Sequence, residues 1–395
     1  MTARSDRIES EHIVIVGGGA SSHSVIEALR DAGSVSAVTM VSRDDRLPYF
    51  RPYLTKELLR AEIGVEDIDL DGEGWYAQHD VTVRLGTDVT GIDLPERTLA
   101  TSAGPLAFDQ LVLATGSAAA SLMVPGADDS LLSIRSAADS LRVLTAVRDG
   151  GPVVVIGSGF IGCEAASAIR SLGNDVTMVS MEHLPQQDRL SPVVGELIAG
   201  WLTEIGVARR GGQTVESIEH VGATTIVHLA DGTTLEAAHV LVASGAKPNV
   251  QLAEAAGLAV DGGVLVDSSM RTAVTGVFAI GDIAKADNEA ARRALRVEHW
   301  GDAETMGRIA GTVLAGHPAS WNDVPGFWSA IAGREIKYVA WGDGWDRTAV
   351  RRSASGITVW YGRDGVVVGV LTYNHDDDLD VGTSLIRSGS TFPPR

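Results

Sequence analysis

Cysteine and long apolar runs are almost absent from this 395-residue sequence. Cys163 is the only cysteine, so no disulfide can form within the chain, and disulfide-reducing chemistry that needs a second thiol is not expected. We expect Cys163 to be a small buried core residue. No stretch reaches the roughly eighteen consecutive apolar residues of a membrane-spanning helix, and residues 1–12 lack the apolar centre of a signal peptide. These absences predict a cytoplasmic protein without a membrane partner.

Positive charge is also scarce. The sequence has 32 Lys and Arg residues against 51 Asp and Glu residues, a net charge of −19. Nucleic-acid binding needs clustered basic residues, so we predict no nucleic-acid partner. The ten histidines are scattered and no Cys-x-x-Cys motif exists, so we predict no metal site. We interpret the acidic run at residues 375–378, HDDD, as a solvated loop.

One pattern occurs twice. Residues 12–22 read HIVIVGGGASS and residues 152–162 read PVVVIGSGFIG, and each is a β-branched run followed by a glycine-rich turn and a helical segment. The sequence VTMVS then follows both copies, at residues 38–42 and 176–180. A strand, glycine turn, helix and second strand form the unit that binds a dinucleotide, so the repeat predicts two nucleotides.

The glycines of each turn have separate tasks. The first permits the tight bend and the second lets backbone N–H groups approach a pyrophosphate, as expected for Gly17 and Gly19 and for Gly157 and Gly159. The third lets the helix pack closely on the strand. It is Gly162 in the second copy but Ser22 in the first, where the small serine should be tolerated.

A carboxylate that binds the adenosine ribose normally follows the second strand. Asp44, one place behind Arg43, is the candidate in the first unit. Ser180 holds the usual acidic position in the second unit, with Glu182 and His183 close behind it. A serine would admit a 2′-phosphate and Glu182 would oppose one, so the choice between NADH and NADPH stays open.

Six motifs carry a family resemblance. They are LPYFRPYLTK at 47–56, LATGS at 113–117, GFIGCEAA at 159–166, KPNVQLAEAAGL at 247–258, VFAIGDIA at 277–284 and VEHW at 297–300. With these motifs the chain resembles the FAD-dependent, NAD(P)H-using ferredoxin reductases of oxygenase systems, relatives of rubredoxin reductase and apoptosis-inducing factor. The resemblance extends to about Trp328.

The resemblance implies an α/β, glutathione-reductase-like flavoprotein with two Rossmann-like domains and a C-terminal α+β interface domain. The expected FAD domain is discontinuous, at residues 1–118 and 247–322, with the NAD(P) domain at 119–246 and the interface domain at 323–395. Hydride would pass from NAD(P)H to FAD.

Particular residues take roles by the same resemblance. Lys56, Glu164 and Glu298 are the expected catalytic residues, and Lys56 would pair with Glu164. The implied FAD positions are Gly17, Gly19, Ala20, Ser22, Arg43, Asp44, Arg51, Lys56, Val89, Ala114, Thr115, Gly116, Arg135, Gly281, Asp282, Val297, His299 and Trp300. The implied NAD(P) positions are Gly157, Gly159, Phe160, Ile161, Gly162, Ser180, Arg189, Gly245 and Trp328.

The C-terminal region departs from the family pattern. Trp328 and Ser329 are kept, but Ala330 and Ile331 replace an Asp-Gln pair, which bears on the electron-acceptor surface. The expected partner is a ferredoxin-type iron–sulfur protein, and because ferredoxins are acidic it would need a local basic patch. The candidate arginines are Arg292, Arg293, Arg296, Arg351 and Arg352. The alternatives are an NAD(P)H oxidase or small-molecule reductase without a protein partner, and a redox-sensing flavoprotein; the oligomeric state is open.

Overall fold

The computed structural model describes residues 11–393, which form two compact units. Unit 1 contains the described residues up to Tyr49 together with Asp69–Ser117 and Pro248–Asp323. Unit 2 contains Phe50–Ile68, Ala118–Lys247 and the residues from Val324 onward. The chain passes between the units five times, and two of these passages lie in β8 (Ser117–Ala119) and β16 (Ala246–Pro248), which form a two-stranded sheet.

Unit 1 is built on a five-stranded parallel sheet with the order β18-β7-β1-β2-β3. The strands are β1 (His12–Val16), β2 (Ala37–Val41), β3 (Val81–Arg84), β7 (Gln110–Leu113) and β18 (Val277–Ala279). Four of the five residues of β1 are wholly buried. Continuous apolar runs of this kind are typical of parallel strands that are covered on both faces.

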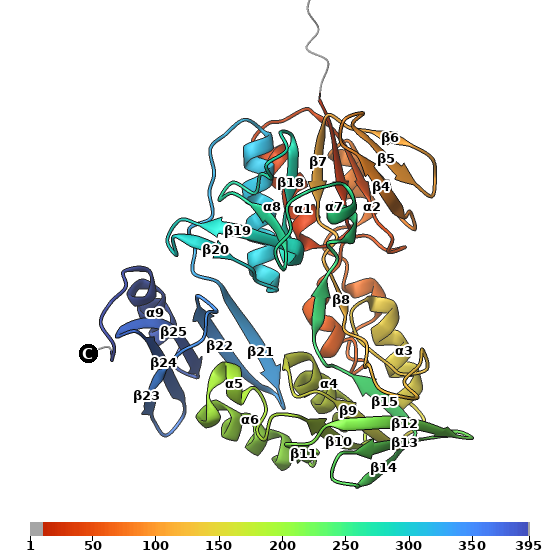
Figure 1. The fold of residues 1–395 in the computed structure, drawn as a ribbon, viewed down its shortest axis with the longest axis vertical. Helices are drawn as coiled ribbons and strands as arrows, with labels where there is room; N and C mark the ends of the chain where they lie inside the picture. Colours follow the sequence, from red (N-terminus) through yellow and green to blue (C-terminus); the bar gives the residue numbers. More distant parts are fainter. Residues whose placement is uncertain (1–10, 394–395) are drawn as a thin grey trace, which may run out of the picture. The chain divides into compact units, whose positions relative to one another are not determined.

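Two helices of unit 1 pack unusually closely (Figure 1). They are α1 (Ala20–Asp31) and α8 (Trp300–Leu314). A Cβ atom at Gly307 would lie 2.3 Å from the Ser21 carbonyl oxygen, and one at Gly311 would lie 2.4 Å from that of Val25. Only glycine permits this approach, so the two glycines bring the α8 backbone against the helix that follows the first glycine turn.

Shorter elements complete unit 1. An antiparallel sheet contains β4 (Val89–Asp93), β5 (Thr98–Thr101) and β6 (Leu106–Ala107). A second small sheet contains β17 (Val264–Val266), β19 (Ala284–Asn288) and β20 (Arg293–Leu295). The remaining helices of this unit are α2 (Glu73–Gln78) and α7 (Gln251–Ala255).

A buried histidine joins α1 to α2. His23 is 5% exposed; its Nδ1 lies 3.0 Å from the Tyr76 hydroxyl, and its Nε2 lies 3.3 Å from an Asp71 carboxylate oxygen. Its ring also stacks on Trp75 at 4.5 Å between centroids. Burial lowers the pKa of His23, and the carboxylates of Glu27 and Asp71 only partly oppose this effect.

This histidine predicts a pH dependence of stability. Below its ordinary pKa of 6.5 the unfolded chain binds a proton that the folded chain takes up only at lower pH, so stability falls as the solution is acidified from about pH 7. His23→Gln should flatten this dependence. The check is the urea midpoint of both proteins from pH 7.5 to 5.5, with the wild-type change larger. Identical changes would contradict the role of His23, because the other titrating groups are common to both proteins.

Unit 2 contains the second glycine turn in a four-stranded parallel sheet with the order β11-β10-β9-β15. The strands are β9 (Pro152–Ile156), β10 (Asp175–Ser180), β11 (Ala208–Gly211) and β15 (His239–Val242). An antiparallel sheet of β12 (Val215–Val221), β13 (Thr224–Leu229) and β14 (Thr234–Ala237) shares its core. The helices are α3 (Ala137–Val147), α4 (Phe160–Ser171), α5 (Gln187–Leu190) and α6 (Pro192–Glu204).

The C-terminal part of unit 2 is a five-stranded antiparallel sheet with the order β21-β22-β25-β24-β23, followed by α9 (Asp377–Arg387). The strands are β21 (Gly326–Ile331), β22 (Arg334–Ala340), β23 (Arg347–Arg352), β24 (Ile357–Arg363) and β25 (Val366–Tyr373). Unit 2 also includes a 3₁₀ turn at Arg51–Thr55, where the Ser140 hydroxyl of α3 donates to the Leu54 carbonyl oxygen at 2.6 Å.

The structure confirms the predicted α/β fold and both repeated units, and corrects one local prediction. The segment after LATG begins with β8, which pairs with β16 from far along the chain. HDDD is a loop only in part: His375 and Asp376 precede α9, whereas Asp377 and Asp378 lie in its first turn, where the helix dipole stabilises carboxylates. The predicted three-domain division remains a prediction beside the two compact units.

None of the helices within residues 11–393 is long and apolar enough to cross a membrane. Residues 1–10, on which the signal-peptide prediction mainly rests, lie outside the described part.

Candidate functional site

The first glycine turn, in unit 1, has the geometry of an anion cradle. Gly17 has a φ of +131°, and a Cβ atom there would lie 2.0 Å from the Ala114 carbonyl oxygen, so glycine is required. At Gly19 a Cβ atom would meet nothing within 4 Å, which leaves the backbone open to a ligand. Helix α1 starts at Ala20 without a side-chain cap and without an acidic residue in its first turn. Its N–H groups and dipole therefore suit a pyrophosphate.

The residues after β2 are arranged around two carboxylates. Asp44 is half-buried and accepts a hydrogen bond of 2.9 Å from the Tyr49 hydroxyl. Arg43 is exposed and pairs with Asp88, next to Val89 at the start of β4. Asp44 thus faces its own loop, and Arg43 is held to the neighbouring segment.

Asp282, another carboxylate of unit 1, is hydrogen-bonded to the LATGS motif. The Ser117 hydroxyl donates to Asp282 at 2.6 Å. Thr115 exchanges two hydrogen bonds of 2.8 Å with Asn249, and Gly116 has a φ of +65°. Asp282 lies in a 3₁₀ turn, Gly281–Ile283, that leads into β19, so it caps no α-helix. Its structural task is to fix the loop after β7, and Ser117 is a partner that sequence reasoning missed.

The VEHW segment precedes α8. Val297 is buried, and Glu298 pairs with Arg296 at 2.5 Å. His299 is the N-cap residue of the helix and its Nδ1 lies 2.9 Å from Asp302, while Trp300 is the first helical residue. The helix therefore begins at the last residue of the VEHW segment.

The second glycine turn, in unit 2, has the same geometry as the first and has glycine at all three positions of the motif. Gly157 has a φ of +113°, and its Cβ atom would lie 2.3 Å from the Ala243 carbonyl oxygen. A Cβ atom at Gly162 would lie 2.2 Å from the Gly157 carbonyl oxygen, so close helix–strand packing needs glycine here. Helix α4 also begins, after Gly159, without a side-chain cap or an acidic residue in its first turn.

Other predicted residues surround this turn. Phe160 and the half-exposed Ile161 begin α4, and Gly245 has a φ of +122° just before β16. Cys163 is wholly buried, and burial raises the pKa of its thiol. The expectation of a packing cysteine is confirmed.

The loop after β10 faces the second glycine turn. Ser180 is the last residue of β10, and its hydroxyl donates to the Glu182 carbonyl oxygen at 2.9 Å. The Glu182 carboxylate accepts from the Ser158 hydroxyl at 3.3 Å and from the Asp188 N–H at 3.0 Å. The acidic group beside the turn is therefore Glu182, two residues beyond the position where acid normally occurs.

The C-terminal sheet holds the far end of this loop. Trp345 Nε1 donates to the Arg189 carbonyl oxygen at 3.0 Å, and the Tyr361 hydroxyl donates to that of Leu190 at 2.7 Å. The Arg189 guanidinium lies 6.0 Å from the centroid of the Phe160 ring. Two residues of the loop, Gln186 and Ser191, have φ values of +59° and +82° without being glycine. A left-handed backbone at a residue other than glycine is strained, and it persists only where the surrounding structure holds it in place.

A buried ion pair lies elsewhere in unit 2. Lys56 Nζ lies 2.7 Å from Glu164 Oε2, and the two side chains are each 6% exposed. The Thr55 hydroxyl donates to the same oxygen at 2.5 Å, and the Ser329 hydroxyl donates to Oε1 at 2.7 Å. The expected pairing is present, and Thr55 and Ser329 are partners that the sequence pattern did not reveal.

Trp328 and two of the predicted arginines also lie in unit 2. Lys56 Nζ lies 4.9 Å from the centroid of the Trp328 ring, which is 39% exposed. Arg51 donates to the Arg135 carbonyl oxygen at 2.6 Å, which brings these two predicted residues together.

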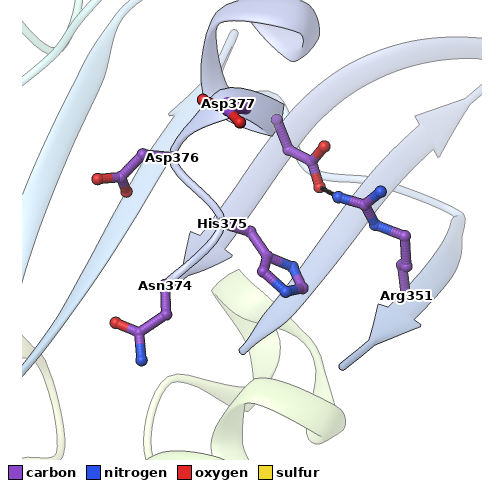
Figure 2. Close-up of a pocket in the computed structure, with 6 residues that line it drawn as sticks. Arg351, Asn374, His375, Asp376 and Asp377 are labelled. Carbon is purple, nitrogen blue, oxygen red and sulfur yellow. Dashed lines mark hydrogen bonds and ion pairs between the residues drawn. The ribbon is translucent and has the colours of Figure 1, made fainter. Parts of the chain in front are cut away.

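The C-terminal sheet contains a separate polar hollow, which Figure 2 shows. Arg351 pairs there with Asp378, and the His375 ring accepts or donates hydrogen bonds at Thr358, 2.8 Å, and Ser353, 2.7 Å. Within residues 11–393 no group of three or more His, Cys, Asp or Glu side chains could hold a metal ion.

The candidate acceptor-patch arginines lie in both units. Arg292 and Arg293 are exposed in unit 1, where Arg296 pairs with Glu298. Arg351 and Arg352 are exposed at the end of β23 in unit 2. Ile331, which stands where the family pattern has a polar residue, is 0% exposed, so it adds no apolar surface at that position.

Two family models match this chain. The model of the pyridine nucleotide-disulphide oxidoreductase family matches residues 11–307, and a reductase C-terminal model matches residues 326–395. The chain belongs to the pyridine nucleotide-disulphide oxidoreductase family. In this member the single cysteine is buried, so the reactive disulfide of the family name has no counterpart in the sequence.

Two relatives of this oxidoreductase match along most of their length. The ferredoxin–NAD(+) reductase component of the biphenyl dioxygenase system of Paraburkholderia xenovorans (strain LB400) is 32% identical over 95% of this chain and 92% of its own. The corresponding component of the anthranilate 1,2-dioxygenase system of Burkholderia cepacia is 31% identical over 98% and 97%. The crystal structure of the covalent putidaredoxin reductase–putidaredoxin complex matches with a TM-score of 0.90 and 28% identity, over 96% of this chain and 93% of that one.

Proposed function

We propose that this protein is an FAD-dependent reductase that accepts hydride from NADH and delivers electrons to a ferredoxin-type iron–sulfur protein in the cytoplasm. The observation that carries the proposal is the pair of glycine turns, each opening into an uncapped helix N-terminus without an acidic first turn. Two such cradles suit two dinucleotides. The acceptor class is supported by the reductase components that the chain matches over nearly its whole length.

The residues fit both cofactors. Gly17, Gly19 and the α1 N-terminus would hold the FAD pyrophosphate, with Asp282 for a hydroxyl of the ribityl chain, and Gly157, Gly159 and the α4 N-terminus would hold NADH. Bound flavin supplies the ability to take up two electrons and release them singly. By family resemblance we assign Lys56 a place next to the reacting ring as a fixed positive charge, and Glu164, which pairs with it, would hold this charge in position. The remaining predicted cofactor residues keep their proposed roles by family resemblance.

The experiment is anaerobic reduction of the purified yellow protein by NADH, followed by turnover with cytochrome c, with and without an oxygenase-system ferredoxin. The proposal expects rapid bleaching and turnover that rises with ferredoxin concentration. Oxygen-consuming turnover that ferredoxin does not change would indicate an oxidase. One stoichiometric bleaching without turnover would indicate a redox sensor, and a colourless protein with no flavin affinity would refute the flavoprotein assignment. Arg292→Glu with Arg293→Glu should raise the ferredoxin concentration needed for half-maximal rate.

The preference for NADH over NADPH can be predicted from the position of Glu182. The Glu182 carboxylate, held by Ser158 and the Asp188 N–H, stands beside the glycine turn where it would repel a 2′-phosphate. We expect NADH to be preferred, and Glu182→Gln to shift the ratio of kcat/KM values toward NADPH by about tenfold, equivalent to about 1.4 kcal/mol. Glu219→Gln on β12, where the carboxylate bonds His228, is the matched control and should leave the ratio unchanged. An unchanged ratio in Glu182→Gln would show that another group selects the nucleotide.

A further inference from the structure

The carboxylate of Glu164 receives hydrogen bonds from two segments that are far from it and from each other in the sequence. Lys56 and Thr55 both donate to Oε2, at 2.7 and 2.5 Å, and both lie at the end of the 3₁₀ turn. Ser329 donates to the other oxygen, Oε1, at 2.7 Å, and it lies on β21 of the C-terminal sheet. All four residues belong to unit 2.

The hydroxyl of Ser329 is buried and fixed by the sheet. Ser329 is 1% exposed and lies opposite Ile336 in the antiparallel ladder of β21 with β22. Its neighbour Trp328 is 39% exposed, and the Trp328 ring lies 4.9 Å from Lys56 Nζ. One short stretch of β21 therefore contacts both members of the Lys56–Glu164 ion pair.

The two oxygens of Glu164 are restrained in different ways. The terminal torsion of a glutamate side chain is broad, so the orientation of the carboxylate plane is set by the hydrogen bonds that its two oxygens accept. Thr55 and Lys56 restrain Oε2, and Ser329 is the donor that restrains Oε1, so the carboxylate plane is held at both oxygens. A buried carboxylate oxygen that loses its donor also carries a desolvation cost.

We propose that Ser329 is a positioning residue that holds Glu164 through Oε1 and thereby holds Lys56 in the orientation that the reaction requires. The C-terminal sheet is thus part of the charge-positioning machinery. The proposal rests on the proposed function only in the role it gives to Lys56. The coupling between Ser329 and Glu164 can be measured independently of that role.

The kinetic test compares Ser329→Ala with Ser329→Thr, which restores a hydroxyl. Flavin bleaching by NADH in stopped flow should slow by about threefold to tenfold in Ser329→Ala, an effect of ordinary size for residues in contact. Ser329→Thr should recover most of the wild-type rate. In a Lys56→Met background, Ser329→Ala should add no further loss, because the group it positions is gone. Ser355→Ala, an exposed hydroxyl between β23 and β24, is the matched control.

The second readout is thermal unfolding of the flavin-loaded protein in a double-mutant cycle. Ser329→Ala should lower the unfolding midpoint by about 2–4 °C in the wild-type background and by much less in Glu164→Leu. Additive midpoints would overturn the coupling whether or not the protein turns over NADH. An equal slowing by Ser329→Ala with and without Lys56 would overturn the positioning role. Failure of NADH to bleach the wild-type protein would instead refute the proposed function, and the unfolding cycle would still decide the coupling.

Discussion

Lys56→Met is expected to slow flavin reduction by NADH about 10²-fold, the usual size of effect when one preorganised electrostatic group is removed from a reacting centre. Lys56 is 5% exposed, and its Nζ lies 2.7 Å from Glu164 and 3.1 Å from the Pro52 carbonyl oxygen. Methionine keeps the length of the side chain and removes its charge. The measurement is the anaerobic bleaching rate together with the flavin reduction potential, which should fall.

Stability must be separated from chemistry in this variant. Removal of one partner of a buried ion pair typically costs roughly 3–5 kcal/mol, because the other charge stays buried without compensation. Lys56→Met combined with Glu164→Leu removes both charges, so it should recover folding stability but not the rate. Lys337→Met, which removes an exposed ion pair with Asp376, is the control and should change neither quantity much. Unchanged rate and potential in Lys56→Met would rule out the electrostatic role.

Gly162→Ala is expected to damage the nicotinamide nucleotide site while sparing the flavin content. The added methyl carbon would lie 2.2 Å from the Gly157 carbonyl oxygen, which is backbone and cannot move aside as a flexible side chain could. Helix α4 must therefore shift away from β9, which misplaces its N-terminus. Overpacking of this kind costs roughly 1–3 kcal/mol. The measurements are the free energy of unfolding, the Kd for NADH, and the ratio of flavin absorbance to protein.

The first glycine turn provides the matched control for this variant. Ser22 stands at the position equivalent to Gly162, is wholly buried, and its hydroxyl has no hydrogen-bond partner within the described residues. A side chain is already accommodated there, so Ser22→Ala should leave stability and flavin content close to wild type. If Gly162→Ala behaved like Ser22→Ala, the close contact between α4 and the second turn would not be a constraint.

The glycine turns could be predicted from the sequence because their cause is local. Gly17 and Gly157 adopt φ values of +131° and +113° against a neighbouring strand, and few other residues tolerate that combination. The short strand β8 could not be predicted, because its partner β16 lies more than 120 residues away and neither strand has a pattern of its own. HDDD was misread because carboxylates favour both solvated loops and helix N-termini.

Only part of the site could be predicted, because its main contacts join residues that are far apart in the sequence. The Lys56–Glu164 pair was expected only through family resemblance, since a contact between residues 108 positions apart leaves no trace in local spacing. Thr55 and Ser329 stood next to recognised residues, but a hydroxyl in a strand or a turn is too common to indicate a role. Glu182 was noticed and left undecided, because only the folded loop shows its carboxylate bonded to Ser158.

The order of segments in the two units has a consequence for biosynthesis. The parallel sheet of unit 1 requires β18, which lies in Pro248–Asp323, so this sheet cannot be completed while the ribosome is producing the first half of the chain. At roughly 5–20 residues per second, the nascent protein would wait several seconds with its apolar parallel strands unprotected. Such a polypeptide should depend on chaperones during translation more than a protein whose domains are completed one after another.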